Sequence, residues 1–192
     1  MKKIILLICL LGALTLFGGC DTFSTQKTNS SQNTNSNNKL ESQKADEDEL
    51  LYGKYPEPIL KAIGECNSVN KDYKTLTKRD LNNIKTLTID ARYSDYGFDV
   101  TKEYDFSILQ YMTNLNKLDI KDIKIKDYSI FTNLNKLETL VLSLLDDNTV
   151  MYLKYLTRLK SLWLFNSSIS NIEFVASLKQ IERFCLINCP YV

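Results

Sequence analysis

Five cysteines are the side chains of this chain best suited to covalent chemistry, and the chain contains no histidine. Without histidine there is no imidazole to act as a general base, to activate a nucleophile or to bind a metal. The sequence also lacks a glycine-rich phosphate loop, a Cys-x-x-Cys pair and a Gly-x-Ser-x-Gly motif. We therefore expect no enzymatic activity, no catalytic residue, no metal site and no cofactor.

The charges of the chain are balanced, with 24 basic and 23 acidic residues. Removal of the N-terminal Lys2 and Lys3 would leave 22 against 23, a formal charge near minus one. A nucleic-acid-binding domain usually carries a basic excess. The composition therefore gives no indication of a nucleic-acid partner.

The N-terminus has the pattern of an export leader. Lys2 and Lys3 precede an apolar run, Ile4 to Phe17, which is shorter than the roughly twenty residues that span a membrane. The run ends in Leu16-Phe17-Gly18-Gly19-Cys20, which resembles the bacterial lipobox. That resemblance implies a signal peptide over residues 1–19 and a lipidated Cys20, carrying acyl chains such as palmitate, as the anchor in the cell membrane or cell surface, on the extracytoplasmic side. An ordinary secretory signal is the alternative.

Residues 20–49 follow the leader and contain few large apolar residues. They are rich in serine, threonine, asparagine and glutamine, most clearly from Thr28 to Asn38. Such a segment cannot bury enough apolar surface to fold. We expect a disordered polar tether, with its acidic end, Asp46 to Glu49, exposed to solvent.

An apolar triplet recurs along the rest of the chain in steps of 22 residues. The four triplets are Leu115, Leu118, Ile120; Leu137, Leu140, Leu142; Leu159, Leu162, Leu164; and Ile181, Phe184, Leu186. A fifth unit, Ile84, Leu87, Ile89, has the same internal spacing but precedes the first of these by a longer interval, so an insert follows it. The alternating pair in each triplet predicts a short parallel strand with two side chains turned inward. A unit of this length leaves no room for a full crossover helix, which favours 3₁₀ turns opposite the strands.

The repeats resemble the bacterial, internalin-like class of leucine-rich repeats, especially at Thr113 to Leu118 and Thr132 to Leu137. The resemblance covers residues 77–192 and implies an α/β repeat fold. This fold is a short solenoid with a curved parallel sheet on the concave face and an irregular or 3₁₀ convex side. The family usually has an asparagine in the turn after the strand, but the matching places hold Arg92, Ile123, Leu145, Ser167 and Cys189. We therefore expect no asparagine ladder.

The ends of the repeat domain are predicted to differ. Residues 50–80 are expected to form a helical N-terminal cap, with a helix from Pro58 to Cys66 and Thr77 as an N-cap three residues before Asp80. Residues 81–192 form the repeat domain, with the insert at residues 91–106. The sequence stops six residues after Leu186 without a C-terminal cap. The last unit is then exposed, associates with a partner or another copy, or continues in a longer gene.

The register predicts a patch of partner-binding residues on the concave face. The apolar members are Val141, Trp163, Phe165, Cys185 and Ile187, which include the only tryptophan of the chain. Exposed apolar patches with tryptophan often mark contact surfaces. Shielding of the patch by the tail, residues 190–192, or by self-association is the alternative. We expect the thiols of Cys66, Cys185 and Cys189 to be buried like small apolar side chains, although Cys185, which faces outward, could be a reactive thiol. Cys66 is too far from Cys185 and Cys189 to form a disulfide with either.

The insert adds aromatic candidates, above all Tyr93 and Tyr96. Such loops recognise proteins and sugars, although this one could instead fold over the first units. Its acids are too widely spaced for a calcium loop. The sequence therefore predicts a surface lipoprotein that binds an unidentified protein of a host or of the envelope through its concave face. The alternatives are a self-associating structural lipoprotein of the envelope and a glycan-binding module.

Overall fold

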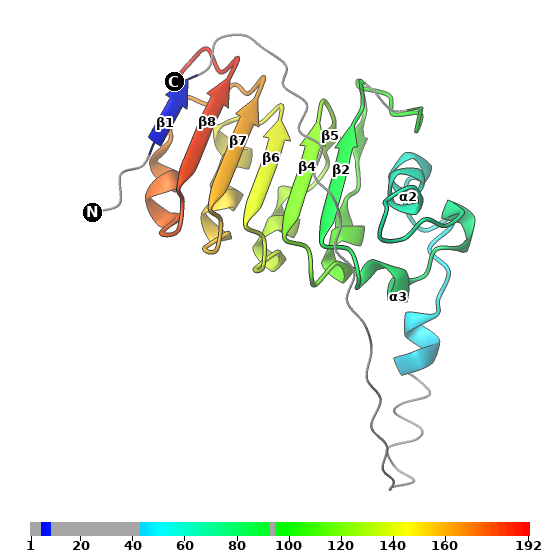
Figure 1. Ribbon diagram of the computed structural model, residues 1–192. Coiled ribbons are helices and arrows are strands. Elements are labelled where there is room, and N and C mark those ends of the chain that lie inside the picture. The colour runs from blue at the N-terminus through cyan, green and yellow to red at the C-terminus, as the bar shows by residue number, and fades with distance from the viewer. Residues whose placement is uncertain (1–4, 9–42, 93–94) are drawn as a thin grey trace, which may run out of the picture.

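The computed structural model describes residues 5–8, 43–92 and 95–192, and its centre is a parallel sheet (Figure 1). The sheet contains β2 (Thr86–Asp90), β4 (Lys117–Lys121), β6 (Thr139–Ser143), β7 (Ser161–Phe165) and β8 (Arg183–Ile187). The order across the sheet is β1-β8-β7-β6-β4-β2, where β1 (Ile5–Ile8) pairs in parallel with β8. Neighbours in the repeat are thus neighbours in space.

The register of the sheet confirms the predicted repeat. Leu140 lies beside Leu118 on one side and Leu162 on the other, and Leu162 lies beside Phe184. These partners stand at the same place in successive units. Leu87 of β2 pairs with Leu118 in the same way, although the insert separates their two units in sequence. Each triplet therefore contributes one rung to a continuous stack of buried side chains.

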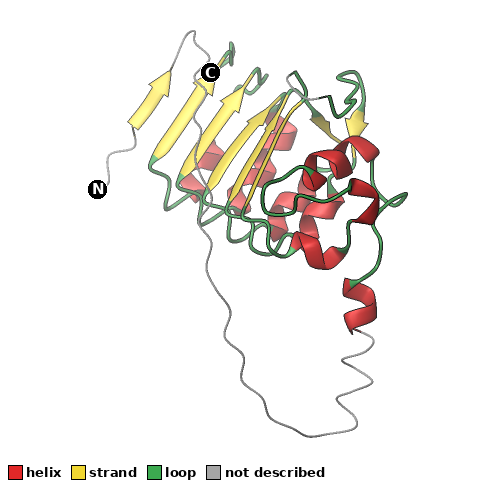
Figure 2. Cartoon of the chain, turned by 45° about the vertical axis from the view of Figure 1, so that its right-hand side comes forward, coloured by secondary structure: helices red, strands yellow, loops and turns green. Residues whose placement is uncertain are grey.

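Short helices cover one face of the sheet, as Figure 2 shows. They are η2 (Ser107–Tyr111), η3 (Tyr128–Asn133), α4 (Asp147–Val150), η4 (Met151–Tyr155) and η5 (Glu173–Ser177), and all but α4 are 3₁₀ helices. The prediction of 3₁₀ turns opposite the strands is confirmed. Their apolar residues, such as Phe131 and Leu153, are fully buried against the strand leucines.

Paired backbone hydrogen bonds join each unit to the next just before the strand. The carbonyl oxygen of Glu138 accepts from the N–H of Lys160 at 2.8 Å and from the N–H of Ser161 at 3.0 Å. The same arrangement of one acceptor and two donors recurs at the carbonyls of Lys85, Asn116 and Lys160. The joint between units is therefore made by the backbone and depends little on side-chain identity.

A column of left-handed residues follows the strands. Its members are Asp122 (φ 54°), Leu144 (φ 63°), Asn166 (φ 49°) and Asn188 (φ 55°), one in each successive unit. The Asn188 side-chain amide donates to Asn166 Oδ1 at 3.1 Å, and the Asn166 amide donates to Asp122 Oδ1 at 3.3 Å. The places that match the family's asparagine lie one residue later and hold Ile123, Leu145, Ser167 and Cys189, so that ladder is missing, as expected. At one of these places Ser167 Oγ accepts from the Leu145 N–H at 3.2 Å instead. Asparagine and aspartate recur in the left-handed column because they tolerate this conformation.

Leu144 is the member of this column least suited to its backbone. A left-handed conformation costs a residue with an ordinary side chain roughly 1–2 kcal/mol, and asparagine bears this cost better. We expect Leu144→Asn to raise the free energy of unfolding by about 1 kcal/mol in urea denaturation. Leu144→Ala is the control, since it shortens the side chain and keeps the strained backbone. An asparagine variant no more stable than the alanine variant would contradict this explanation.

The N-terminal side of the sheet carries α2 (Glu57–Gly64), η1 (Tyr73–Thr75) and α3 (Lys78–Leu81). The helix expected from Pro58 to Cys66 is thus α2, which begins just after Pro56. The predicted N-cap of α3 is also present, because the Thr77 N–H donates to Asp80 Oδ2 at 2.9 Å. Ile59, Leu60 and Ile63 of α2 are fully buried in the same core as the repeats.

The acidic segment before the cap is exposed to solvent, as expected, and it also pairs with basic side chains. Residues 43–47 are helical, and Asp46 Oδ1 lies 2.6 Å from Lys78 Nζ. Asp48 Oδ1 lies 3.0 Å from Arg79 Nη2, and Glu49 pairs with both Lys54 and Lys78. Hydrogen bonds to Asp46 and Glu49 raise the pKa of Lys78. The sequence did not predict these ion pairs because most of the basic partners lie far along the chain, on α3.

Candidate binding surface

The face of the sheet opposite the short helices carries two rows of side chains, which together we call the open sheet face. The first row is Thr88, Asp119, Val141, Trp163 and Cys185. The second row is Asp90, Lys121, Ser143, Phe165 and Ile187. Members of a row lie side by side on adjacent strands, about 4.8 Å apart. The five apolar residues predicted for this face, Val141, Trp163, Phe165, Cys185 and Ile187, all belong to these rows.

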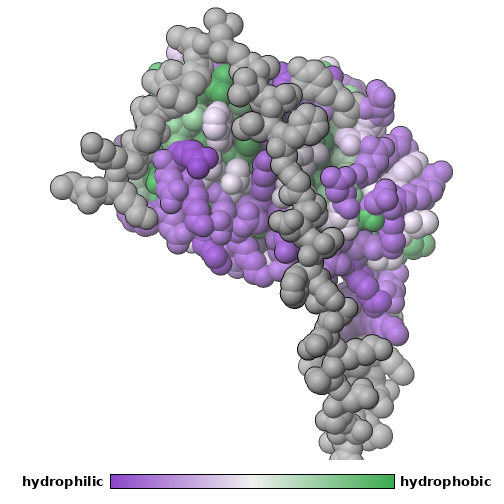
Figure 3. All heavy atoms as spheres, viewed as in Figure 1, coloured by the Kyte–Doolittle hydropathy of each residue, from purple (hydrophilic) through white to green (hydrophobic). Residues whose placement is uncertain are grey.

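The five predicted apolar contact residues differ in their exposure to solvent. Trp163, Phe165 and Ile187 are partly exposed, whereas Val141 is 8% and Cys185 is 3% exposed. The short side chains of Val141 and Cys185 both flank the large Trp163 ring in register, and β1 borders Cys185 on its other side. Hydrophobic surface, green in Figure 3, is visible on this face with polar surface below it. Cys185 thus lies on this face, as the register predicted, and its thiol is buried, as expected of a small apolar side chain, which is against a reactive thiol.

Charged side chains lie next to the aromatic ones. Lys121 Nζ is 3.3 Å from Asp119 Oδ2 and 5.7 Å from the centre of the Phe165 ring. The Lys121 side chain therefore reaches from β4 across β6 toward β7. The indole Nε1 of Trp163 donates to Ser161 Oγ at 3.0 Å, which fixes the edge of that ring. The surface combines an acid, a base and two aromatic rings.

Asp119 is the unusual member of this group. It is 8% exposed, and its Oδ1 atom is buried and accepts no hydrogen bond from the described residues. Burial raises the pKa of Asp119, although the nearby positive charges of Lys121 and Lys117 act in the opposite direction. A buried carboxylate oxygen without a donor is uncommon and destabilising.

Asp119 and Lys121 are not among the contact residues predicted from the sequence. The available signal was an Asp-x-Lys pair within a strand whose neighbouring strands carry Val141, Trp163 and Phe165 on the same face. An acid surrounded by such neighbours loses hydration. Only the structure shows that Lys121 satisfies one carboxylate oxygen and leaves the other without a donor.

The insert folds largely onto the domain. Tyr96, Phe98 and Tyr104 pack against the core, and the Phe98 and Tyr104 ring centres are 5.0 Å apart. The Asp99 N–H donates to the Tyr104 hydroxyl oxygen at 2.7 Å. Tyr93 lies outside the described residues, as does Cys20. The arrangement favours the interpretation that the insert covers the first units.

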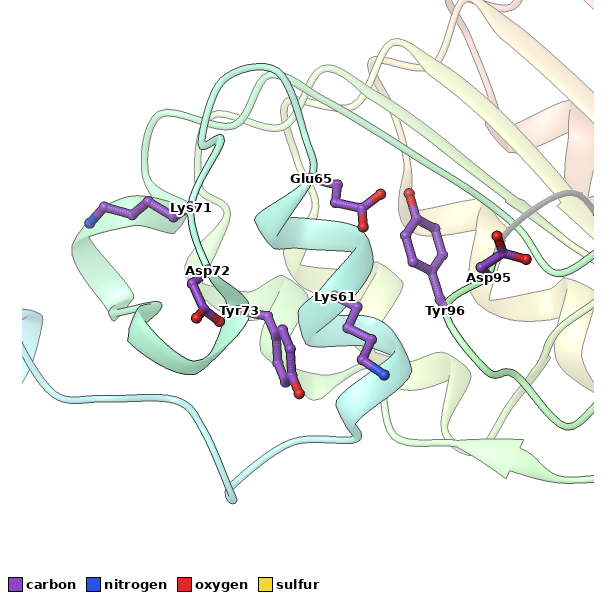
Figure 4. A pocket seen from close by; sticks show the side chains of 7 residues that line it. All are labelled: Lys61, Glu65, Lys71, Asp72, Tyr73, Asp95 and Tyr96. Carbon is purple, nitrogen blue, oxygen red and sulfur yellow. The ribbon is translucent and has the colours of Figure 1, made fainter.

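Tyr96 also borders a cavity of about 300 Å³ between α2 and the insert (Figure 4). Its lining residues are Lys61, Glu65, Lys71, Asp72, Tyr73, Asp95 and Tyr96. Glu65 and Tyr96 point toward one another, and burial, followed by the Glu65 charge and hydrogen bond, raises the pKa of Tyr96. Lys71 pairs with Asp80 at 2.7 Å, and Lys61 pairs with Glu57 at 2.9 Å. Because both lysines already have acidic partners, the cavity is a weaker candidate for recognition than the open sheet face.

The cysteines of the described residues are present as thiols. Cys66, Cys185 and Cys189 form no disulfide there, and Cys66 Sγ lies 3.2 Å from Ser68 Oγ. Within residues 5–8, 43–92 and 95–192, no group of three or more histidine, cysteine or acidic side chains is placed to hold a metal ion. None of the helices in that part of the chain is long and apolar enough to cross a membrane.

Known proteins resemble the chain in structure. No known protein family and no curated protein matches the sequence. Two solved internalins of Listeria monocytogenes, InlF and InlC2, are similar over 70% and 69% of this chain, with identities of 24% and 25% and TM-scores of 0.49 and 0.48. The leucine-rich-repeat ectodomain of the receptor kinase SOBIR1 from Arabidopsis thaliana matches 55% of this chain and 70% of its own, at 17% identity and a TM-score of 0.31.

These likenesses are partial. The chain spans 36% of the length of InlF and 65% of that of InlC2. The decisive observations are therefore those of the chain itself. A parallel strand, a 3₁₀ helix and a left-handed turn recur from unit to unit, and the leucines of the units pack into one core. By this architecture the described part of the chain is a leucine-rich-repeat solenoid.

Proposed function

We propose that the chain is a surface-anchored lipoprotein whose leucine-rich-repeat domain binds a protein partner, of a host or of the cell envelope, through the open sheet face. The observation that carries the proposal is the grouping of partly exposed Trp163, Phe165 and Ile187 beside Asp119 and Lys121. Tryptophan and neighbouring aromatic residues dominate binding energy at many protein interfaces. A rigid sheet holds these side chains in place before binding, which limits the entropy lost on association.

The proposed location rests on the sequence. The apolar leader and the Cys20 motif support export and lipid anchoring, and several acyl chains on one residue suffice for stable attachment. The polar segment after Cys20 would hold the repeat domain away from the membrane surface. In this arrangement the open sheet face remains accessible to proteins outside the cell.

The test is a pull-down with the chain from residue 20 onward, with Cys20→Ser to prevent lipidation. We expect the double variant Trp163→Ala, Phe165→Ala to weaken capture of any specific partner by about 2 kcal/mol or more, since both rings leave the contact. Met151→Ala with Tyr152→Ala is the matched control, because these exposed residues lie on η4, on the opposite side of the sheet. Retention of every partner by the Trp163, Phe165 variant would refute the proposal.

Self-association is the second candidate. The observation in its favour is that β8 accepts a parallel strand, β1, on its outer edge. Because β1 belongs to the predicted signal peptide, cleavage would leave that edge of β8 unpaired and able to bind another strand. Sedimentation of the same cleaved chain separates the two candidates, since a strict monomer at high concentration contradicts self-association.

A further inference from the structure

Asp119 lies on the open sheet face with one carboxylate oxygen that has no hydrogen-bond donor among the described residues. We propose that the protein partner supplies a cationic side chain, arginine or lysine, that binds Asp119 Oδ1. This inference rests on the proposed function, because it assumes that the partner contacts the open sheet face. It adds the chemistry of the contact, which is a positive charge beside aromatic rings.

The Asp119 carboxylate is buried and incompletely paired, which favours a cationic group on the partner. Only 8% of the Asp119 surface is exposed, and only Oδ2 is paired, with Lys121 Nζ at 3.3 Å. That distance is long for a charge-assisted hydrogen bond, which is usually about 2.7–2.9 Å. A second positive donor would satisfy Oδ1 and offset the cost of keeping the charge out of water. A neutral donor would satisfy only the hydrogen bond.

The strand beside Asp119 toward Trp163 carries no charge of its own. Lys117 and Lys121 lie on the strand of Asp119, and Asp90 lies on β2. On β6 the neighbouring residues Val141 and Ser143 are uncharged. A cation that approaches over β6 therefore meets only the ammonium group of Lys121, whose side chain reaches across β6 toward Phe165.

The aromatic side chains of the face can pack against the arginine or lysine side chain of the partner. Trp163 is two strands from Asp119, about 10 Å, which is within the span of an extended arginine lying over Val141. A guanidinium or its stem stacks favourably on an indole ring. The Phe165 ring already has an ammonium group, that of Lys121, 5.7 Å from its centre. Within the domain, Lys121 thus already places a cation between an acid, Asp119, and an aromatic ring, Phe165.

Access to Oδ1 requires movement of a side chain. Lys121 is the candidate, because its side chain is 25% exposed and its four-carbon stem is flexible. In this proposal Lys121 turns about its stem as the partner cation approaches Asp119. The backbone of β4 does not have to change.

The experiment is selection of peptides from a random display library on the immobilised chain from residue 20 onward, with Cys20→Ser. We expect the binders to be enriched in arginine or lysine at one position. Asp119→Asn, which keeps the shape of the side chain, should weaken these peptides about tenfold or more. Replacement of the selected arginine or lysine by glutamine should weaken them equally, and the two losses should not add. Glu173→Gln on η5 is the charge-matched control and should leave binding unchanged.

The outcomes separate this inference from the proposed function. If Trp163→Ala abolishes binding but Asp119→Asn does not, and no basic residue is enriched, the open sheet face binds peptides and the cation proposal is overturned. If Asp119→Asn weakens the glutamine-substituted peptide as much as the original, Asp119 acts only on the structure, and the proposal is again overturned. If Trp163→Ala leaves binding unchanged, the proposed function itself fails.

Discussion

Leu140→Ala is expected to lower the free energy of unfolding by about 3–4 kcal/mol, a large part of the stability of a domain of this size. Leu140 is completely buried on β6, in the middle of the sheet, with Leu118 and Leu162 beside it. Truncation removes its contacts with both neighbouring units. The parallel strands on each side are held by backbone hydrogen bonds and cannot move together to fill the cavity. Urea denaturation followed by circular dichroism measures the effect.

The slope of the same unfolding curve carries further information. Repeat proteins are stabilised by the contacts between adjacent units, so a defect in the middle can uncouple the two halves. We expect the slope to be unchanged if the domain still unfolds as one unit, and a smaller slope if the halves separate. Asn135→Ala is the control, because Asn135 is exposed in the turn before β6. A loss below about 1 kcal/mol in Leu140→Ala would mean that the core tolerates the cavity by repacking.

Asp119→Val is expected to stabilise the partner-free domain by about 1–3 kcal/mol at neutral pH. The wild-type protein keeps a buried carboxylate oxygen without a donor among the described residues, and valine removes that polar atom. Val141 shows that the same row accepts valine. Lys121 loses an ion pair in this variant, but its partly exposed ammonium group can turn to solvent. Thermal unfolding of both proteins measures the difference.

The stability advantage of Asp119→Val over wild type should depend on pH. Burial raises the pKa of Asp119 in the folded state, so its ionised form disfavours folding above that pKa. As the pH falls through the raised pKa toward the ordinary value, wild type takes up a proton in the folded state, and the advantage of Asp119→Val shrinks. The acids with lowered pKa, such as Asp146 and Asp147, are present in both proteins and cancel in the comparison. An advantage that grows on acidification would contradict this explanation.

Much of the fold could be predicted from the sequence, because the repeat imposes the same local structure again and again. The spacing of Leu118, Leu140 and Leu162 was enough to predict the strands, their parallel order and their register. The N-cap at Thr77 follows from local hydrogen bonding over three residues, which the sequence displays directly. Structural features such as these are specified by a few neighbouring residues or by a pattern that recurs at a fixed interval.

Side-chain contacts between residues that lie far apart in the sequence were harder to predict. The hydrogen bonds that link the side chains of Asp122, Asn166 and Asn188 join turns of separate units, and the stacking of the units brings these turns together. The pairing of Asp46 and Asp48 with α3 joins segments that are far apart in sequence and belong to no repeat. Such contacts are decided by tertiary packing.

For the binding surface, the sequence could predict which side chains share a face but not how exposed they are. Alternation along the strand places Val141, Trp163 and Cys185 in one row. Exposure depends on the packing around each side chain, and Val141 and Cys185, on either side of Trp163, are both buried. The path of Lys121 across β6 depends on its rotamer, which no sequence pattern specifies.

The paired hydrogen bonds between units have an evolutionary consequence. Each joint presents one backbone carbonyl to two backbone N–H groups of the next unit, at the same point of every unit. A recombination event that adds or deletes one whole repeat unit therefore recreates an identical joint, whereas an event of any other length misplaces the donors. Genes of this architecture can lengthen or shorten by unequal crossing-over without a new folding solution. The binding face would then change in width, one strand at a time.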